Sequence, residues 1–355
     1  MRVVPNKRLP VSVLTGFLGS GKTTVLNHLT RQPTFGRTLV LINEFGEIGL
    51  DQDLVAYSSE DDFVVEMASG CLCCTIRGDL AKTLREAPGR FARGGELWFD
   101  RVVIETTGLA DPAPILHTLM SDPSVVRRFY LSSVVTTVDT VNGADTLDRQ
   151  IESVKQAAMA DRLLLTKADL ANSHQLALLK ERLKTLNPTS PQIVCEHGML
   201  DGEVLFDSNP YDPTPKSKDV REWLNAEAFS DNHDHHHHHS HDDHGHHAHH
   251  HDVNRHDEEI RSFCLTIDEP IAGEALDRWL DVVLTLRGAD LLRMKGILNI
   301  AQLDRPAVIH GVQHIFHPLT TLDAWPSDDR RSRIVFITRN IQESEIRSTL
   351  KLLDC

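Results

Sequence analysis

The feature that most constrains this chain is a glycine-rich segment, GFLGSGKT at residues 16–23. It matches the phosphate-loop pattern Gly-x4-Gly-Lys-[Ser/Thr] in full. The apolar residues 10–15 before it predict a buried strand, and residues 24–29 after it predict a helix. In that arrangement backbone N–H groups gather at a helix N-terminus, where the helix dipole favours negative charge. The sequence therefore predicts a nucleotide site; a glycine-rich turn that binds no ligand is the alternative.

The loop is expected to bind the phosphates of a nucleotide together with Mg²⁺. Lys22 would reach the β- and γ-phosphates, and the Thr23 hydroxyl would be a ligand of the Mg²⁺ that bridges them. The nucleotide-binding residues predicted here are Gly16, Gly19, Ser20, Gly21, Lys22, Thr23 and Thr24.

Residues 10–200 alternate between short apolar runs and helical patterns. Near-continuous Val, Ile and Leu runs indicate a mostly parallel sheet that is covered by helices on both faces. The strands predicted after the first one are residues 37–43, 63–67, 101–105, 131–138, 162–166 and 192–195. We therefore predict an α/β fold of the P-loop NTPase type, with ligands bound beyond the carboxyl ends of the strands.

A carboxylate and a glycine follow one of these strands. Glu105 ends an apolar run, and Gly108 comes three residues later. Glu105 would hold Mg²⁺ through water or orient the attacking water, while the Gly108 N–H would meet the γ-phosphate. We predict Lys22, Glu105 and Gly108 as catalytic residues and Thr23 and Glu105 as the magnesium site. An ordinary acid at a strand end is the alternative for Glu105.

Another strand ends in a pattern that is typical of guanine recognition, Thr166-Lys167-Ala168-Asp169. Asp169 would accept two hydrogen bonds, from N1–H and the exocyclic amine of the base. We therefore expect GTP rather than ATP, with Thr166, Lys167 and Asp169 as further nucleotide-binding residues. Threonine in place of the usual asparagine removes one side-chain amide from this pattern.

Three cysteines lie within four residues, at Cys71, Cys73 and Cys74, directly after a predicted strand. Alternation along an extended chain places Cys71 and Cys73 on one side, and a turn at Gly70 would bring Cys74 beside them. Three converging thiolates suit Zn²⁺ and leave a fourth position for water or another side chain. Inert buried thiols and a redox pair are the alternatives.

Taken together, four motifs closely resemble the CobW family of metal-handling GTPases. They are the phosphate loop, residues 43–51, the cysteine segment at residues 70–74 and residues 105–112. The family's phosphate loop, Cys-x-Cys-Cys and Glu-x-x-Gly motifs correspond to Gly16–Thr23, to the three cysteines, and to Glu105 with Gly108. Residues 260–355 resemble the family's C-terminal domain.

The resemblance implies a GTPase that delivers a transition metal to a client protein. The metal is usually Zn²⁺; the family includes zinc chaperones, cobalamin-pathway proteins and nitrile hydratase activators, so Co²⁺ or Ni²⁺ stays open. We expect residues 44–51 to sense the γ-phosphate, with Glu44 or Glu47 as fourth metal ligand. GTP would gather the thiolates and hydrolysis would release the ion. No evident Gln or Arg finger is present, so intrinsic turnover should be slow.

Residues 207–259 form a predicted disordered linker that is rich in histidine. Residues 233–256 hold 14 of the 21 histidines of the chain, interleaved with Asp, Ser, Gly and Ala. Such a composition builds no core, and its neutral imidazoles bind transition metals weakly. The predicted low-affinity ligands are His235, His236, His237, His238, His239, His246, His247, His249, His250 and His251. A solvated spacer is the alternative.

The linker divides the chain into a P-loop GTPase domain at residues 1–206 and a smaller α+β domain at residues 260–355. The second domain is a plausible surface for the client. His310, His314 and His317 lie there, and we expect them to be exposed sheet histidines rather than a metal site, since His317 would face away from the other two in one strand.

Composition limits the partners. The net charge of −14 argues against nucleic acid. No apolar run reaches a membrane span, and the first residues lack the hydrophobic core of a signal peptide, so we expect a cytoplasmic protein. The oligomeric state stays open. A passive histidine-rich metal buffer and a P-loop kinase of small molecules are the rival functions.

Overall fold

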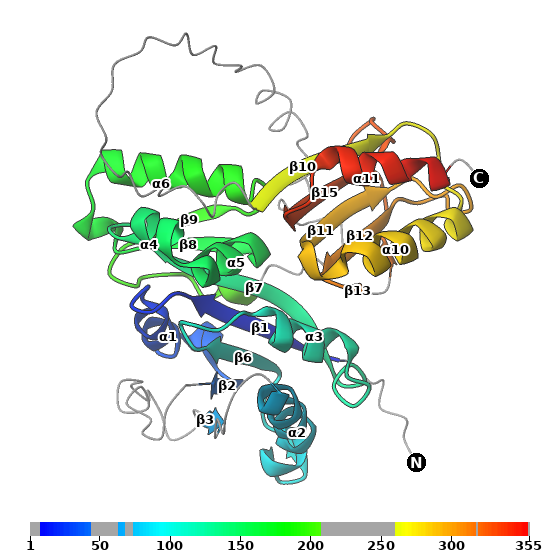
Figure 1. Ribbon diagram of the computed structural model, residues 1–355. Coiled ribbons are helices and arrows are strands. Elements are labelled where there is room, and N and C mark those ends of the chain that lie inside the picture. The colour runs from blue at the N-terminus through cyan, green and yellow to red at the C-terminus, as the bar shows by residue number, and fades with distance from the viewer. Residues whose placement is uncertain (1–7, 44–62, 68–73, 207–259, 317–318, 354–355) are drawn as a thin grey trace, which may run out of the picture.

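The computed structural model describes residues 8–43, 63–67, 74–206, 260–316 and 319–353. Figure 1 shows two sheets, each with its own helices. The first is a seven-stranded sheet of order β3-β2-β6-β1-β7-β8-β9, and each of its pairings is parallel. Its strands are β1 (Leu9–Gly16), β2 (Thr38–Asn43), β3 (Phe63–Met67), β6 (Arg101–Thr106), β7 (Phe129–Asp139), β8 (Arg162–Thr166) and β9 (Gln192–Cys195). The predicted parallel α/β sheet is confirmed.

Helices cover both faces of this sheet because its strands are apolar on both sides. They are α1 (Lys22–Leu29), α2 (Cys74–Arg90), α3 (Ala113–Ser121), α4 (Gly143–Arg149), α5 (Ile151–Met159), α6 (Ser173–Leu186) and α7 (Glu203–Phe206). Along β1, Val13 packs into the core under α2 to α6, whereas its neighbour Leu14 packs against α1 and α7. Alternate residues thus fill two cores, and each fully buried Leu or Val contributes about 1.5–3 kcal/mol.

The second sheet is antiparallel and contains β10 (Ile260–Ile267), β11 (Leu291–Leu298), β12 (Ala307–Val312), β13 (Ile315–Phe316), β14 (Thr320–Thr321) and β15 (Ser332–Arg339). The helices α10 (Gly273–Arg287) and α11 (Glu343–Thr349) pack on one face, with Trp279 fully buried among them. The predicted α+β C-terminal unit is confirmed. Minor elements are β4 (Ala92–Arg93), β5 (Glu96–Leu97) and 3-10 turns at Pro33–Phe35, Ala168–Leu170, Gly288–Asp290 and Leu350–Leu353.

The other face of the second sheet packs against the first unit. Strands β10, β11 and β12 contact α6, α5 and α3 respectively, and Leu292, Val312 and Ile337 belong to the same apolar core as the helices of the parallel sheet. This contact corrects one expectation: His310 on β12 is only 4% exposed, because its face of the sheet is covered. His314, in the turn after β12, is exposed as predicted, and His317 lies outside the described residues.

Candidate nucleotide site

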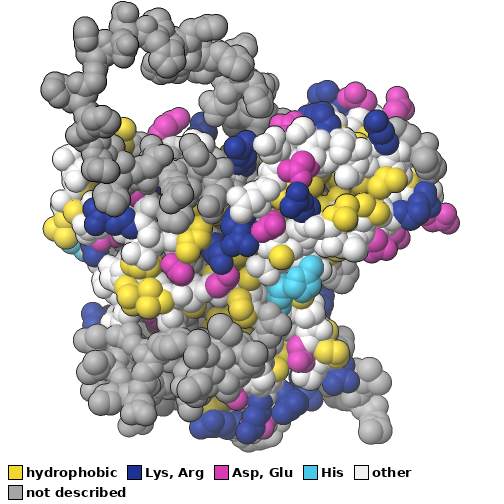
Figure 2. Space-filling view, in the orientation of Figure 1, with side chains coloured by type: hydrophobic (Ala, Val, Ile, Leu, Met, Phe, Trp, Pro, Cys, Tyr) yellow, Lys and Arg dark blue, Asp and Glu magenta, His cyan; other side chains and the backbone are white. Residues whose placement is uncertain are grey.

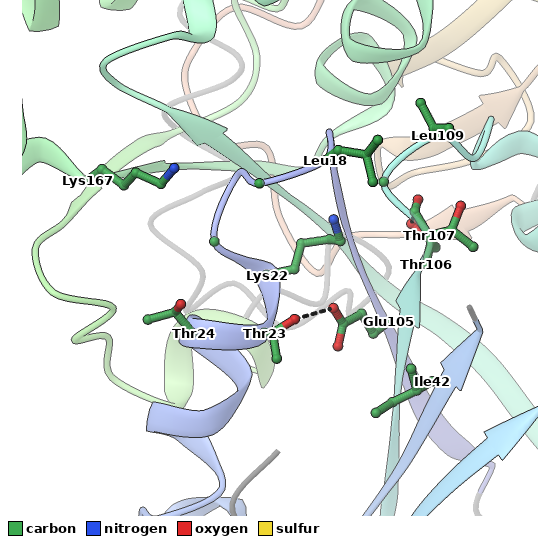
Figure 3. A pocket seen from close by; sticks show the side chains of 13 residues that line it. Leu18, Lys22, Thr23, Thr24, Ile42, Glu105, Thr106, Thr107, Leu109 and Lys167 are labelled. Atoms are coloured by element: carbon green, nitrogen blue, oxygen red, sulfur yellow. Dashed lines mark hydrogen bonds between the residues drawn. The ribbon is translucent and has the colours of Figure 1, made fainter. Parts of the chain in front are cut away.

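The phosphate loop connects the end of β1 to the start of α1 (Figure 3). Gly16 has a φ of 142°, and a Cβ atom there would lie 2.2 Å from Thr137 Oγ1 and 2.5 Å from Thr137 O. Glycine is therefore required where the loop passes β7. The buried hydroxyls of Ser20 and Thr137 lie 2.7 Å apart and tie the loop to that strand. The loop is thus held by the sheet core, so its backbone N–H groups are positioned before any ligand arrives.

Lys22, the first residue of α1, turns back under the loop. Its Nζ atom donates hydrogen bonds to Gly16 O at 2.9 Å and Phe17 O at 3.3 Å. The ammonium group is therefore fixed inside the curve of the loop, beside Glu105 (Figure 3). This is where a cation can meet phosphate oxygens.

Two oxygen ligands meet beside this lysine. Thr23 Oγ1 on α1 donates to Glu105 Oε1 at the end of β6, 3.3 Å away, and Glu105 is 3% exposed. Thr106 Oγ1 donates to Thr15 Oγ1 at 2.8 Å, which holds the end of β6 against β1. A hydroxyl and a carboxylate are hard oxygen donors of the kind that Mg²⁺ prefers. The residues present therefore fit a magnesium ion.

Gly108 lies directly against the phosphate loop. A Cβ atom at this position would lie 2.6 Å from Leu18 N and 2.7 Å from Leu18 Cα. Any larger residue would push the segment after Glu105 away from the loop. The close approach explains why a glycine follows the carboxylate at this spacing, and it places the Gly108 backbone at the phosphate side of the site.

These groups surround a cavity of about 530 Å³ at the carboxyl edge of the sheet. Most of its lining residues were predicted, while Leu18, Ile42, Thr106, Thr107 and Leu109 were not. The lining consists of Leu18, Gly19, Gly21, Lys22, Thr23, Thr24, Ile42, Glu105, Thr106, Thr107, Gly108, Leu109 and Lys167. The structure thus brings the predicted catalytic residues Lys22, Glu105 and Gly108 into one cavity.

Thr166 stands where the guanine-recognition pattern usually has asparagine. Its Oγ1 donates to Ser20 O at 2.6 Å, which joins the end of β8 to the phosphate loop. The next residue, Lys167, has a φ of 56° and places its Nζ atom 2.8 Å from Asp139 Oδ2. Burial alone raises the pKa of Asp139, but hydrogen bonds from Lys167 and Asn142 outweigh it and hold that pKa below the ordinary range.

Asp169 is positioned by a loop that follows β9. Its Oδ1 atom accepts the His197 backbone N–H at 3.1 Å, and its Oδ2 atom lies 3.2 Å from His197 Nδ1. The backbone hydrogen bond from His197 keeps the pKa of Asp169 low, so the carboxylate is ionised at neutral pH. An ionised carboxylate accepts hydrogen bonds only, which is what the N–H groups of guanine require. Asp169 does not line the cavity around Lys22; it lies farther along the same edge.

Comparison with known proteins identifies the chain. Residues 10–194 match the family model described as the CobW/HypB/UreG nucleotide-binding domain, and residues 260–353 match the cobalamin synthesis protein cobW C-terminal domain. The chain belongs to the CobW family. It is 30% identical to the zinc chaperone CobW of Pseudomonas aeruginosa over 97% of this chain and 91% of that protein. It is 29% identical to the zinc chaperone YjiA of Escherichia coli over 96% and 97% of the two chains.

A solved structure has the same fold over the full length. The crystal structure of Zn(II)-bound YjiA GTPase from E. coli matches this chain with a TM-score of 0.67 and 26% identity. The match covers 98% of this chain and 99% of that one. This chain and the YjiA structure therefore share the same architecture, a P-loop unit followed by a C-terminal sheet.

The predicted metal ligands of this CobW-family chain fall largely outside the described residues. Cys71, Cys73, Glu44, Glu47 and the histidine tract all do so; Cys74 begins α2, but its side chain is not described. Within the described ranges, no group of three or more His, Cys, Asp or Glu could hold a metal ion. The same ranges contain no helix long and apolar enough to cross a membrane.

The topology nonetheless restricts where the cysteine segment begins and ends. It leaves the carboxyl end of β3 and enters α2 at Cys74. Strand β3 is two positions from β6 in the parallel sheet, and all these strands end at one edge. At about 4.8 Å between strands, the segment starts roughly 10 Å from the strand that carries Glu105.

Besides the five unpredicted residues that line the cavity, sequence reasoning missed three polar residues near the site. Asp139 ends β7 and His197 follows β9, so the rule that ligands lie beyond strand ends would have found both. Gln156 is different. It lies in the middle of α5, fully buried, and donates hydrogen bonds to Gly108 O at 3.2 Å and Ala110 O at 3.0 Å. A glutamine in an amphipathic helix carries no motif that indicates such a role.

Proposed function

We propose that this chain is a zinc chaperone that hydrolyses GTP, binds the ion through Cys71, Cys73 and Cys74, and delivers it to a client protein. The chain is a GTPase of the CobW family: it has the family's nucleotide-binding domain, and the relatives that match along its full length are named as zinc chaperones, one of them also as a GTPase. The observation that carries the proposal is the meeting of Lys22, Thr23, Glu105 and Gly108 in one cavity.

Each residue of the cavity has a task in GTP hydrolysis. Lys22, fixed by two backbone carbonyls, binds the β- and γ-phosphates. Glu105 and Thr23 would hold Mg²⁺, which would neutralise charge that develops on the phosphates. The Gly108 N–H would sense the γ-phosphate, and Asp169 would select guanine by accepting two hydrogen bonds from the base. Intrinsic turnover is slow, because no described residue approaches the cavity as an arginine finger.

The transported ion is Zn²⁺, with three thiolates as ligands and Glu44 or Glu47 as the fourth. Co²⁺ and Ni²⁺ are the alternative ions. The histidine tract at residues 233–256 would collect metal at many weak sites and supply it to the cysteines. We assign the GTPase domain to residues 1–206, the linker to residues 207–259 and the C-terminal domain, as the client surface, to residues 260–355.

Energetics require that nucleotide and metal sites be coupled. Zinc sites of thiolate type bind with about 10–16 kcal/mol, so spontaneous release is slow. Changing such a site from 99% closed to 99% open requires about 5.5 kcal/mol of differential binding. Strands β3 and β6 end at the same edge of one sheet, which supports a coupling between the segments that follow them.

The test is Zn²⁺ affinity, measured by competition with a chelator, with Mg²⁺ and either GDP or a non-hydrolysable GTP analogue. The full chain is compared with a variant that lacks residues 231–256. We expect one site that binds more tightly in the triphosphate state and persists without the tract. Cys73→Ala removes that site and leaves GTP binding intact. The matched control is Cys264→Ala, because Cys264 is a half-buried thiol of β10 whose pKa is raised by burial to about 11.

Other results would exclude the chaperone. Loss of nearly all metal capacity on deletion of the tract indicates a passive buffer. Affinity that ignores the nucleotide, combined with phosphate transfer to a small acceptor, indicates a kinase.

A further inference from the structure

Helix α5 holds the segment that follows Glu105. Gln156 donates to the carbonyls of Gly108 and Ala110, and its neighbour Lys155 forms an ion pair with Asp111, Nζ to Oδ2, at 2.8 Å. The Gln156 carbonyl in turn accepts a hydrogen bond from Thr136 Oγ1 of β7 at 2.9 Å. One helix therefore connects residues 108–111 to the sheet.

The other end of the same helix is bound to the C-terminal sheet. Arg293 of β11 donates to Met159 O, the last residue of α5, and to Asp161 Oδ1. Lys295 Nζ lies 2.7 Å from the same carboxylate oxygen. The three charged side chains are at most 5% exposed, so this contact is not screened by water. Asp161 Oδ2 accepts the Val134 N–H at 2.9 Å, which fixes the carboxylate to β7.

The arrangement in space agrees with these contacts. In Figure 1, α5 lies over the parallel sheet beside β7, with its end toward β11, and contacts between α5 and β1, β7 and β11 are all present. The space-filling view shows further Lys or Arg and Asp or Glu side chains at the surface where the two units meet (Figure 2); Arg293, Asp161 and Lys295 are buried beneath that surface. The nucleotide edge and the C-terminal sheet are thus joined through one nine-residue helix.

Gln156 is satisfied on one side only. Its amide nitrogen has two acceptors, but Oε1 is buried and has no hydrogen-bond partner among the residues that the structure describes. A buried acceptor without a donor is costly. An alternative arrangement of residues 107–111 that supplied a hydrogen-bond donor to Gln156 Oε1 would therefore be favoured. The peptide planes of this segment are rigid, so rotation of the Gly108 N–H toward the γ-phosphate also moves neighbouring carbonyls.

We propose that α5 couples the γ-phosphate to the C-terminal domain, with Gln156 as the positioning residue at the nucleotide end and the Arg293–Asp161 contact at the other. The proposal rests on the GTPase part of the function above and not on the cysteine site. When Gly108 moves, α5 either follows or loses two hydrogen bonds from a buried amide. Because its far end is locked to β11 by buried charges, the C-terminal sheet responds.

Hydrogen exchange of the full chain tests the coupling. We expect amide exchange in β11 (Leu291–Leu298) to differ about three- to tenfold between the GDP state and the state with a non-hydrolysable GTP analogue. Gln156→Leu abolishes the difference. The matched control is Gln192→Leu, since Gln192 also donates from a part-buried amide to a backbone carbonyl, that of Lys180, at 2.9 Å; this variant retains the difference. No nucleotide dependence in the unmodified chain overturns the proposal.

Hydrolysis supplies a second readout. In steady-state assays, Gln156→Leu and Arg293→Met each lower kcat about three- to tenfold with little change in KM, and the double variant shows less than the product of the two effects. Arg293→Met keeps the Lys295–Asp161 pair. If Gln156→Leu does not fold, Lys155→Met removes only the part-exposed ion pair and should reduce the β11 response. Independent, fully multiplicative effects contradict the coupling.

The two proposals fail in different ways. If the unmodified chain hydrolyses no GTP, the proposed function fails. If hydrolysis occurs and β11 does not respond to the nucleotide, the coupling alone fails.

Discussion

The two sheets use charged residues in opposite ways. In the parallel sheet, charged residues lie at or next to the strand ends, as with Glu105 and Asp139. In the antiparallel sheet, β11 carries Arg293 and Lys295 in its middle, both buried. The difference follows from what each face meets: helices cover the first sheet with apolar residues, whereas β11 faces the carboxylate of Asp161. Charged residues at the strand ends are available for a ligand, while those within β11 hold the two units together.

The largest expected effect comes from disrupting the buried contact of Asp161 with Arg293 and Lys295, which we call the anchor. Asp161→Asn removes the buried carboxylate that Arg293 and Lys295 share, so we expect about 3–5 kcal/mol less free energy of unfolding. Denaturant titration measures it. Asp323→Asn is the control, because the Arg305–Asp323 pair is about 60% exposed on both sides and such pairs contribute about 0–1 kcal/mol. Equal losses for both would contradict an anchoring role.

The same carboxylate predicts a pH dependence. Arg293 and Lys295 outweigh the effect of burial and lower the pKa of Asp161 to about 2. The folded pKa is thus below the unfolded one, near 3.9. Its contribution to stability is therefore complete at neutral pH and is lost as the pH falls from about 4 through 2. In Asp161→Asn this part of the acid sensitivity should be absent.

Much of the first unit could be predicted from sequence. Because parallel strands are buried on both faces, their runs of Val, Ile and Leu predict the strands directly. Gly16 and Gly108 belong to sequence motifs, and each is required because another segment of backbone passes close to it. The anchor could not be predicted. Asp161 is separated from Arg293 and Lys295 by over a hundred residues, and each of the three alone is typical of a solvated charge. Only the packing of α5 on β11 makes them one group.

The burial of His310 also could not be predicted from the sequence. The alternation of β12 indicates that His310 and Val312 share a face, but it does not tell what covers that face. The first unit covers it, so the histidine is buried.

A smaller effect is expected from a change in the nucleotide site at the strand ends. Lys22→Ala removes the cation from the phosphate loop, and we expect kcat for GTP to fall about 10²- to 10³-fold, as when one preorganised donor is lost. The variant should remain folded at normal conditions, since the hydrogen bonds between Ser20 and Thr137 and from Thr166 to Ser20, which hold the loop to the sheet, are kept. Lys351→Ala, at the end of the chain, is the control. Unfolding of the Lys22 variant at normal conditions would show that the loop is part of the anchor after all.

The smallest expected effect tests how finely the strand-end residues are positioned. Asp169→Asn exchanges for a donor one of the two acceptor oxygens that we propose for the base, so GTP affinity should fall about 10- to 100-fold, in keeping with hydrogen bonds to a charged group. His197→Ala removes only the ring beside Oδ2, whereas the backbone N–H that holds Oδ1 remains. We therefore expect about a twofold loss of GTP affinity, within the range of a solvent-exposed ion pair. Equilibrium binding of a fluorescent GTP analogue measures both, with His174→Ala on the exposed face of α6 as control. If His197→Ala weakens binding as much as Asp169→Asn, the histidine ring contacts the nucleotide itself, and the loop after β9 is part of the binding site instead of its support.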